Sequence, residues 1–208
     1  WSHHMGQHPA EPVVIIGTEG LSWDDVEPSA TPALWGMLRD GASATGVTAA
    51  VTGASGDCSA AGWLGLSSGR SPVTGEVDDG AWTCAPWSVD PAEGADSADG
   101  ADGAASGADG PAQVEGWQDL AGLQSRSEFR PRLGVLGEAL ADGGTCVTAV
   151  GPGAALALAG TDGTVDRYRG LEAALADPDD TFSCPVTVVD AGAAPRPPTG
   201  QGSAAPGP

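Results

Sequence analysis

Glu19 is the residue whose type and position first indicate chemistry in this chain. It closely follows residues 13–16, four β-branched apolar residues that predict a strand buried on both faces. In an open parallel sheet, ligands are bound just beyond the carboxyl ends of strands. Glu19 at this point is either a metal ligand or a turn residue, and the residues alone favour the turn.

Four cysteines offer a second kind of chemistry. They are Cys58, Cys84, Cys146 and Cys184. None lies in a CxxC pair and every histidine falls within the first eight residues, so a structural zinc site is not expected. An even number of cysteines in an acidic, lysine-free chain favours disulfides and an oxidising compartment. We favour Cys58–Cys84 and Cys146–Cys184, because each pair lies on one side of a long polar insert; four reduced, buried thiols are the alternative.

Several other polar positions have simpler interpretations. Asp24 and Asp25 are expected at a helix start or on the surface. Three aspartates recur every three residues in the insert, a spacing that does not match a calcium-binding EF-hand loop. These are Asp96, Asp99 and Asp102. The run Gly151-Pro152-Gly153 lacks the third glycine of a dinucleotide-binding loop and predicts a tight helix start instead.

Tryptophan supplies most of the aromatic residues, seven against two Phe and one Tyr. Trp35 and Trp63 lie on apolar helical faces and are predicted to be core residues. Trp82 and Trp87 flank Cys84 in a loop. Exposed tryptophans of this kind mark binding surfaces for sugars or partners, and packing over the disulfide is the equally weighted alternative.

Composition excludes some partners. The formal charge is −20, which repels phosphate backbones and anionic membranes, so no nucleic-acid partner is expected. No apolar run approaches the roughly 20 residues that span a bilayer, so no transmembrane segment is expected in this chain. Residues 1–12 are interpreted as a leader or tag remnant.

The elements that must position these residues alternate along the chain. Strands are predicted over residues 13–16, 45–52, 146–150, 164–168 and 185–190, and helices begin near Thr31-Pro32, Cys58, Arg132, Gly151 and Gly170. Residues from about 90 to 116 are rich in Ala, Asp, Gly and Ser and are predicted to be a disordered insert. The pattern predicts one α/β domain over residues 13–192, with a mainly parallel sheet flanked by helices. Residues 193–208 are predicted to form a flexible tail.

Three segments resemble a known family. VVIIGTEGLSWDDV, TPALWGMLRDGA and CSAAGWLGLSSGRSPVTG are similar to the opening of the alkaline phosphatase-like superfamily, which includes sulfatases, nucleotide pyrophosphatases and phosphoglycerate mutases. TPALW, CxxxGWLxLSxG and AVGPGAALALA resemble most closely the extracellular part of an actinobacterial membrane protein of this superfamily. The resemblance covers residues 13–72 and 130–192, and it implies an alkaline phosphatase-like fold, present here as a partial domain.

The resemblance also assigns roles to two residues. Glu19 occupies the position of the first metal-binding aspartate, and Cys58 lies close to the position of the nucleophile. Enzymes of the superfamily bind two metals, usually zinc or manganese, through several Asp and His residues. This chain has no histidine beyond His8. If Cys58 is bonded to Cys84, it has no thiolate with which to attack a substrate.

These expectations favour a non-catalytic or degenerate domain outside the cytoplasm, tethered to the membrane in the full-length protein. Its role would be binding or scaffolding in the cell envelope, with an envelope protein or a glycan as partner and no cofactor. One alternative is a phosphatase or sulfatase that uses zinc or manganese and whose remaining ligands lie in a missing C-terminal half. A disulfide-stabilised interaction module is the other. The oligomeric state is not indicated by the sequence.

Overall fold

A computed structural model describes residues 11–44, 58–91 and 110–194. Residue contacts divide the chain into two compact units, each described by itself: the larger contains residues 1–17 and 45–191, and the smaller contains residues 18–44 and 192–208. The predicted strand over residues 45–52 and the aspartates Asp96, Asp99 and Asp102 lie outside the described residues. A single domain over residues 13–192 stays a prediction.

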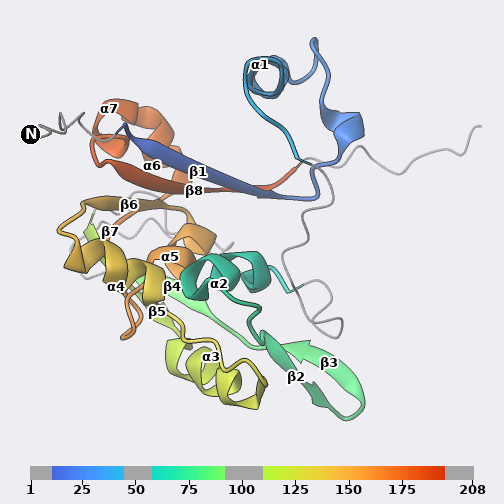
Figure 1. Cartoon of the computed structure of the whole chain (residues 1–208), viewed down its shortest axis with the longest axis vertical. Helices are drawn as coiled ribbons and strands as arrows, with labels where there is room; N and C mark the ends of the chain where they lie inside the picture. The colour runs from blue at the N-terminus through green and yellow to red at the C-terminus, as the bar shows by residue number, and fades with distance from the viewer. Residues whose placement is uncertain (1–10, 45–57, 92–109, 195–208) are drawn as a thin grey trace, which may run out of the picture. The chain divides into compact units, whose positions relative to one another are not determined.

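A six-stranded sheet forms the centre of the fold (Figure 1), with the strand order β1-β8-β6-β7-β5-β4. The strands are β1 (Val13–Glu19), β4 (Ser88–Pro91), β5 (Gly110–Glu115), β6 (Val147–Val150), β7 (Thr164–Arg169) and β8 (Val186–Ala193). β6 pairs in parallel with both β7 and β8, whereas β5 is antiparallel to both β4 and β7. β1 runs in the direction of β8, since the Val13 N–H donates to the Pro185 carbonyl at their starts and the Ala194 N–H donates to the Glu19 carbonyl at their ends. The sheet is therefore mostly parallel, which confirms the predicted α/β class.

Helices pack on both faces of the central strands. The main core joins α2 (Ala60–Ser68), α3 (Trp117–Leu123), α4 (Val135–Asp142) and α5 (Pro152–Leu158) to one face. A smaller cluster joins α6 (Leu171–Ala176) to Val150 and Val189, and α7 (Pro178–Thr181) follows α6 directly. The short helix η2 (Gln124–Arg126) continues α3. A separate hairpin of β2 (Gly75–Asp78) and β3 (Ala81–Cys84) projects beside α3 in Figure 1.

Helix α5 lies at the centre of the packing because its residues are small. Its start is sharp: Gly151 has φ +81°, which glycine adopts without strain, and Pro152 occupies the first turn. This is the tight helix start that the sequence predicted. Every residue from Gly153 to Leu158 is buried. Gly153 lies directly beneath the indole of Trp63, so that any side chain at this position would overlap the ring.

The prediction that residues 13–16 are buried on both faces is wrong. Val13, Val14 and Ile16 are 52%, 44% and 56% exposed, and only Ile15 packs against the main core. The reason is position: β1 is at one end of the strand order, with β8 as its neighbour among the described strands. Sequence pattern identifies a strand, but it does not distinguish a central strand from an edge strand when both are apolar.

The predicted limits of the disordered insert are also wrong. Strands β4 and β5 fall partly or wholly within residues 90–116, and Ala112 and Val114 of β5 are 4% and 1% exposed. The alternation of Ala112 and Val114 with polar neighbours is a period-two pattern. This pattern was not predicted from the sequence because Gly, Pro, Ala and Glu, which make up most of β5, have low β-propensity. Residues 92–109 lie outside the described part of the chain.

Two tryptophans predicted to be core residues have different environments. Trp63 is 9% exposed and lies in the main core, as predicted. Trp35 is 43% exposed, so its assignment to the core is wrong. It belongs to α1 (Pro32–Asp40) of the smaller unit, a helix with no buried residue. Trp117, by contrast, is 2% exposed and donates its indole N–H to the carbonyl of Thr161 at 3.0 Å.

The smaller unit begins with polar turns. In the 3₁₀ helix η1 (Trp23–Asp25), the Asp25 carboxylate accepts hydrogen bonds from the backbone N–H and the hydroxyl of Ser22, both at 2.8 Å. The backbone bond, followed by the hydroxyl, lowers the pKa of Asp25. Asp25 is therefore a helix-start residue, as expected. Thr31 occupies the N-cap of α1, but its hydroxyl contacts the preceding turn and not the helix.

Two helical glycines provide a matched test of the core packing. Gly62 on α2 has open space around it, whereas a Cβ on Gly137 of α4 would lie 2.7 Å from the carbonyl oxygen of Ala159. We expect Gly62→Ala to stabilise the protein by about 0.5–1 kcal/mol through helix propensity. Gly137→Ala should destabilise it by about 1–3 kcal/mol because backbone must move. Urea unfolding of both variants measures the difference, and equal effects would contradict the packing of α4 on α5.

Candidate functional site

The Cys58–Cys84 disulfide includes Cys58, the cysteine that the family resemblance places close to the nucleophile. Cys58 lies just before α2 and is 7% exposed, whereas Cys84 ends β3 and is exposed. Their Cα atoms are 5.7 Å apart. A disulfide that closes a 26-residue separation stabilises the fold by about 3.5 kcal/mol in the chain-entropy model.

The β2–β3 hairpin presents the partner of Cys58. Its two-residue turn uses positive φ at Asp79 and Gly80, +46° and +80°, the backbone that favours Asp-Gly in such turns. Alternate residues of a strand point to the same side, so Trp82 accompanies Cys84. The Trp82 indole N–H donates to the Cys58 sulfur at 3.4 Å. Trp82 therefore packs over the disulfide, one of the two alternatives left open by the sequence.

The other tryptophan of this loop contacts the core. Trp87 is half-buried and packs against the main cluster, just before β4. Both Trp82 and Trp87 keep part of their surface exposed. A binding role for this surface stays a prediction.

Glu19 is described in a different unit from Cys58. It ends β1, is exposed, and its backbone carbonyl accepts a hydrogen bond from the Ala194 N–H at 2.8 Å. Across residues 11–44, 58–91 and 110–194, no group of three His, Cys, Asp or Glu residues is placed to hold a metal ion. The Cys58 sulfur is bonded to the Cys84 sulfur, so it is not a thiolate that could bind a metal. These residues do not fit the zinc or manganese centre that the family resemblance implies.

One carboxylate lies where an open α/β sheet binds ligands, and the sequence did not single it out. Asp190 follows Val189, the β8 residue that pairs with the last residue of β6, and its Oδ2 accepts a hydrogen bond from the Gly153 N–H at 2.8 Å. Burial raises the pKa of the nearby Tyr168 hydroxyl, and the negative charge of Asp190 adds to this shift. Asp190 thus tethers the start of α5 to β8. Position at the end of a predicted strand was the signal that could have identified it.

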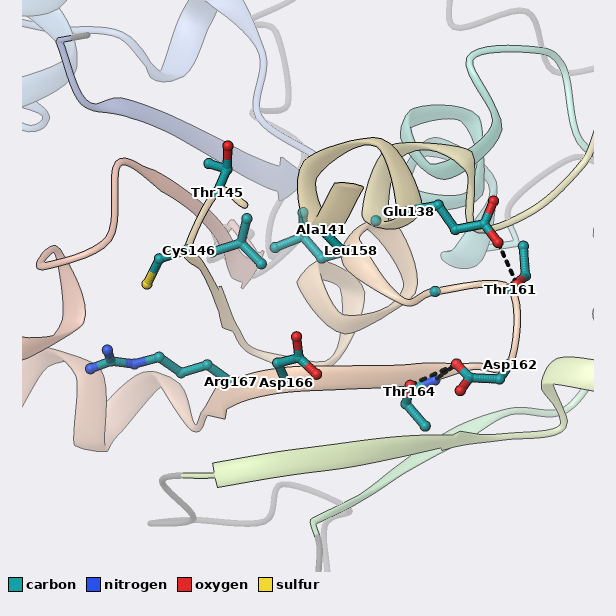
Figure 2. Close-up of a pocket in the computed structure, with 13 residues that line it drawn as sticks. Glu138, Ala141, Thr145, Cys146, Leu158, Thr161, Asp162, Thr164, Asp166 and Arg167 are labelled. Atoms are coloured by element: carbon teal, nitrogen blue, oxygen red, sulfur yellow. Dashed lines mark hydrogen bonds between the residues drawn. The ribbon is translucent and has the colours of Figure 1, made fainter. Parts of the chain in front are cut away.

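A pocket of about 470 Å³ lies at the opposite, amino-terminal ends of β6 and β7. Its walls come from α4, the start of β6, the end of α5, the following loop and β7. Figure 2 shows Glu138, Thr161 and Asp162 at one end, with Cys146 and Arg167 extending toward the other. Sequence analysis predicted the cysteine and its disulfide but not the pocket, because its walls come from segments distant in sequence.

Two carboxylates of this pocket are held by hydroxyl groups. The Thr161 hydroxyl donates to Glu138 Oε1 at 2.6 Å and lowers the Glu138 pKa, and Arg132 adds to this shift. The Thr164 hydroxyl donates to Asp162 Oδ1 at 2.6 Å, and the Thr164 N–H donates to the same atom at 2.9 Å. Both bonds lower the pKa of Asp162. Both carboxylates therefore lose their charge at a lower pH than ordinary Glu and Asp side chains do.

A second pocket, of about 430 Å³, lies beside the exposed half of the Cys58–Cys84 disulfide. It is lined by the β2–β3 hairpin, including Cys84, and by α3 and η2. Arg126 of η2 forms an ion pair with Glu76 of β2 across this surface. Its walls carry both charges and amide groups, so the pocket offers hydrogen-bond donors and acceptors to a polar ligand.

Comparison with family models, with curated proteins and with solved structures gave no match to this chain. Among the described residues, no helix is long and apolar enough to span a bilayer.

The Glu138–Thr161 bond can be tested by pH. The pKa of Glu138 lies below its ordinary value of 4.5, so its stabilising effect is complete above 4.5 and is lost as pH falls through the folded pKa. Thr161→Val removes the hydroxyl donor, and we expect the pKa of Glu138 to rise toward 4.5. NMR titration of the Glu138 carboxyl carbon measures this shift.

Thr164→Val is the matched control, since that hydroxyl contacts Asp162 and not Glu138. It should raise the pKa of Asp162 and leave that of Glu138 in place. An unchanged Glu138 pKa in Thr161→Val would contradict the hydrogen bond.

Proposed function

We propose that this chain is a non-catalytic binding domain of alkaline phosphatase-like type that works outside the cytoplasm. The observation that carries the proposal is the state of Cys58. This residue stands close to the position that the resemblance gives to the nucleophile, and its sulfur is bonded to Cys84 and covered by Trp82. A sulfur in a disulfide has no thiolate with which to attack an ester.

The compartment is inferred from the cysteines. All four are paired, as Cys58–Cys84 and Cys146–Cys184, which is the connectivity favoured from the sequence. Disulfides that stabilise a fold are typical of secreted and envelope proteins and rare in the cytosol. Tethering to a membrane through the full-length protein is part of the proposal, and it rests on the resemblance.

The partner we propose is an envelope glycan. Polar groups and aromatic surface lie near each other on the hairpin side of the larger unit: Trp82 and Trp87 keep exposed area, and the second pocket beside Cys84 carries charged and amide groups. Sugars are bound by this combination of ring faces and hydrogen bonds. An envelope protein is the alternative partner.

The absence of catalysis is tested with metals and two esters. Calorimetric titration with zinc and manganese should show no tight uptake, and p-nitrophenyl phosphate and p-nitrophenyl sulfate should not be hydrolysed above background. Glu19→Ala should be indistinguishable from the wild type, because Glu19 is exposed and lies in no metal-binding cluster of the described residues. Tight uptake with turnover that Glu19→Ala abolishes would establish the metal-dependent hydrolase instead.

Glycan binding is tested by tryptophan emission. Titration with soluble peptidoglycan fragments should change the emission of the wild type, and Trp87→Phe should reduce that change. Trp35→Phe is the control, because Trp35 is exposed on α1 in the smaller unit. An equal response in both variants would exclude Trp87 from the site, and no response in the wild type would favour a protein partner.

A further inference from the structure

The two disulfides differ in their surroundings, although each joins an exposed to a buried cysteine. Cys146 is exposed and lines the 470 Å³ pocket, and its partner Cys184 is 2% exposed. A guanidinium nitrogen of Arg167, Nη1, lies 3.8 Å from the Cys184 sulfur. The polar group at the Cys58 sulfur is the neutral indole N–H of Trp82.

We propose that Cys146–Cys184 is a thiol-exchange site that reacts with cationic thiols entering this pocket. The inference does not depend on the proposed glycan-binding role. The reaction is thiol–disulfide exchange, the reacting atoms are Cys146 Sγ and the sulfur of the incoming thiolate, and the substrates are thiols that carry a positive charge.

Access decides which sulfur is attacked. Cys146 is exposed and lines the pocket, whereas Cys184 is 2% exposed, so an incoming thiolate attacks Cys146 Sγ. Figure 2 shows the Cys146 side chain and the Arg167 guanidinium extending to the same end of the pocket. Cys184 is therefore the leaving sulfur.

Arg167 assists the departure of that sulfur. A cation beside a cysteine lowers the pKa of its thiol, and a leaving thiol of lower pKa leaves faster. Arg167 also pairs with Asp180 at 2.6 Å, which offsets part of its charge. Asp180 is shared with a second cation, since Arg169 contacts the same oxygen at 2.8 Å. Because Asp180 is divided between two guanidinium groups, it offsets only part of the charge of Arg167.

The charges of the pocket select the substrate. Three carboxylates line it, Glu138, Asp162 and Asp166, against the guanidinium of Arg167, and Arg132 outside the lining pairs with Glu138. Carboxylates are ionised at neutral pH, hydrogen bonds lower the pKa of Glu138 and of Asp162 further, and the whole chain carries a formal charge of −20. A thiol that also carries a positive charge is attracted to this field, and an anionic thiol is repelled.

The reaction balances as an exchange. The incoming thiolate forms a bond to Cys146 Sγ, and the Cys146–Cys184 bond breaks with its electron pair passing to Cys184 Sγ, which then takes a proton from solvent. A second thiolate attacks the incoming sulfur of the mixed disulfide. Two thiols are thereby oxidised to one disulfide, and the protein is reduced by two electrons.

The experiment compares both disulfides in one molecule. The oxidised chain is treated at low ionic strength with cysteamine or 2-mercaptoethanesulfonate at equal thiolate concentration, then alkylated and analysed by peptide mass spectrometry. We expect Cys146–Cys184 to open before Cys58–Cys84, and cysteamine to open it faster than the sulfonate. Added salt should reduce that preference because it screens the charges. The same assay with two peptides, one with its cysteine between two arginines and one with its cysteine between two glutamates, tests whether the substrate is a protein thiol. If the arginine peptide opens Cys146–Cys184 faster than cysteamine does, the substrate is a protein thiol and not a small one.

Variants separate charge from packing. Arg167→Gln should slow the opening of Cys146–Cys184 by about threefold to twentyfold, and Arg167→Lys should recover most of the rate. Asp166→Asn should reduce the preference for cysteamine. Arg39→Gln is the control, because Arg39 is exposed on α1, pairs with Asp40 and lines neither pocket.

Three results would overturn the proposal: earlier opening of Cys58–Cys84, equal rates for the two thiols at low salt, or a wild-type rate in Arg167→Gln. The first two are measured on the wild type, so they apply even if Arg167→Gln does not fold.

Discussion

The close packing of α5 against its neighbours is the constraint on which the larger unit depends. Gly153 and Gly17 both contact the indole of Trp63, and Gly137 contacts the backbone at the end of α5. A side chain at any of these glycines would push helices or strands apart. Because these three glycines allow close approach, α5 is buried along its length. The helices of the main core therefore pack densely on one face of the sheet.

The two disulfides fasten this packed centre at different places. Cys58–Cys84 joins the start of α2 to the β2–β3 hairpin, and Cys146–Cys184 joins the starts of β6 and β8. Each leaves one sulfur at a pocket and buries the other. Their neighbours differ in charge, an indole in one case and a guanidinium in the other, and the proposed difference in reactivity rests on this contrast.

The larger pocket does not lie where parallel sheets usually bind ligands. Parallel sheets bind ligands at the carboxyl ends of their strands. At that end of β6 and β8, Asp190 is engaged with the start of α5. The larger pocket instead opens at the amino-terminal ends of β6 and β7, where a loop with charged residues follows α5. Charge and access, and not strand direction, define the reactive surface that we propose.

Sequence alone predicted the alternation of strands and helices and the tight start of α5, and it favoured the cysteine pairing that the structure has. Those features follow from local physics: apolar runs, turn residues such as Gly151-Pro152, and the placement of cysteines on either side of an insert. Only the tertiary structure decided that β1 is an edge strand, that β5 lies between β7 and β4, that Trp35 is exposed, and that Arg167 approaches Cys184. Burial and electrostatics at these residues depend on segments far apart in the chain, which meet only when the sheet assembles.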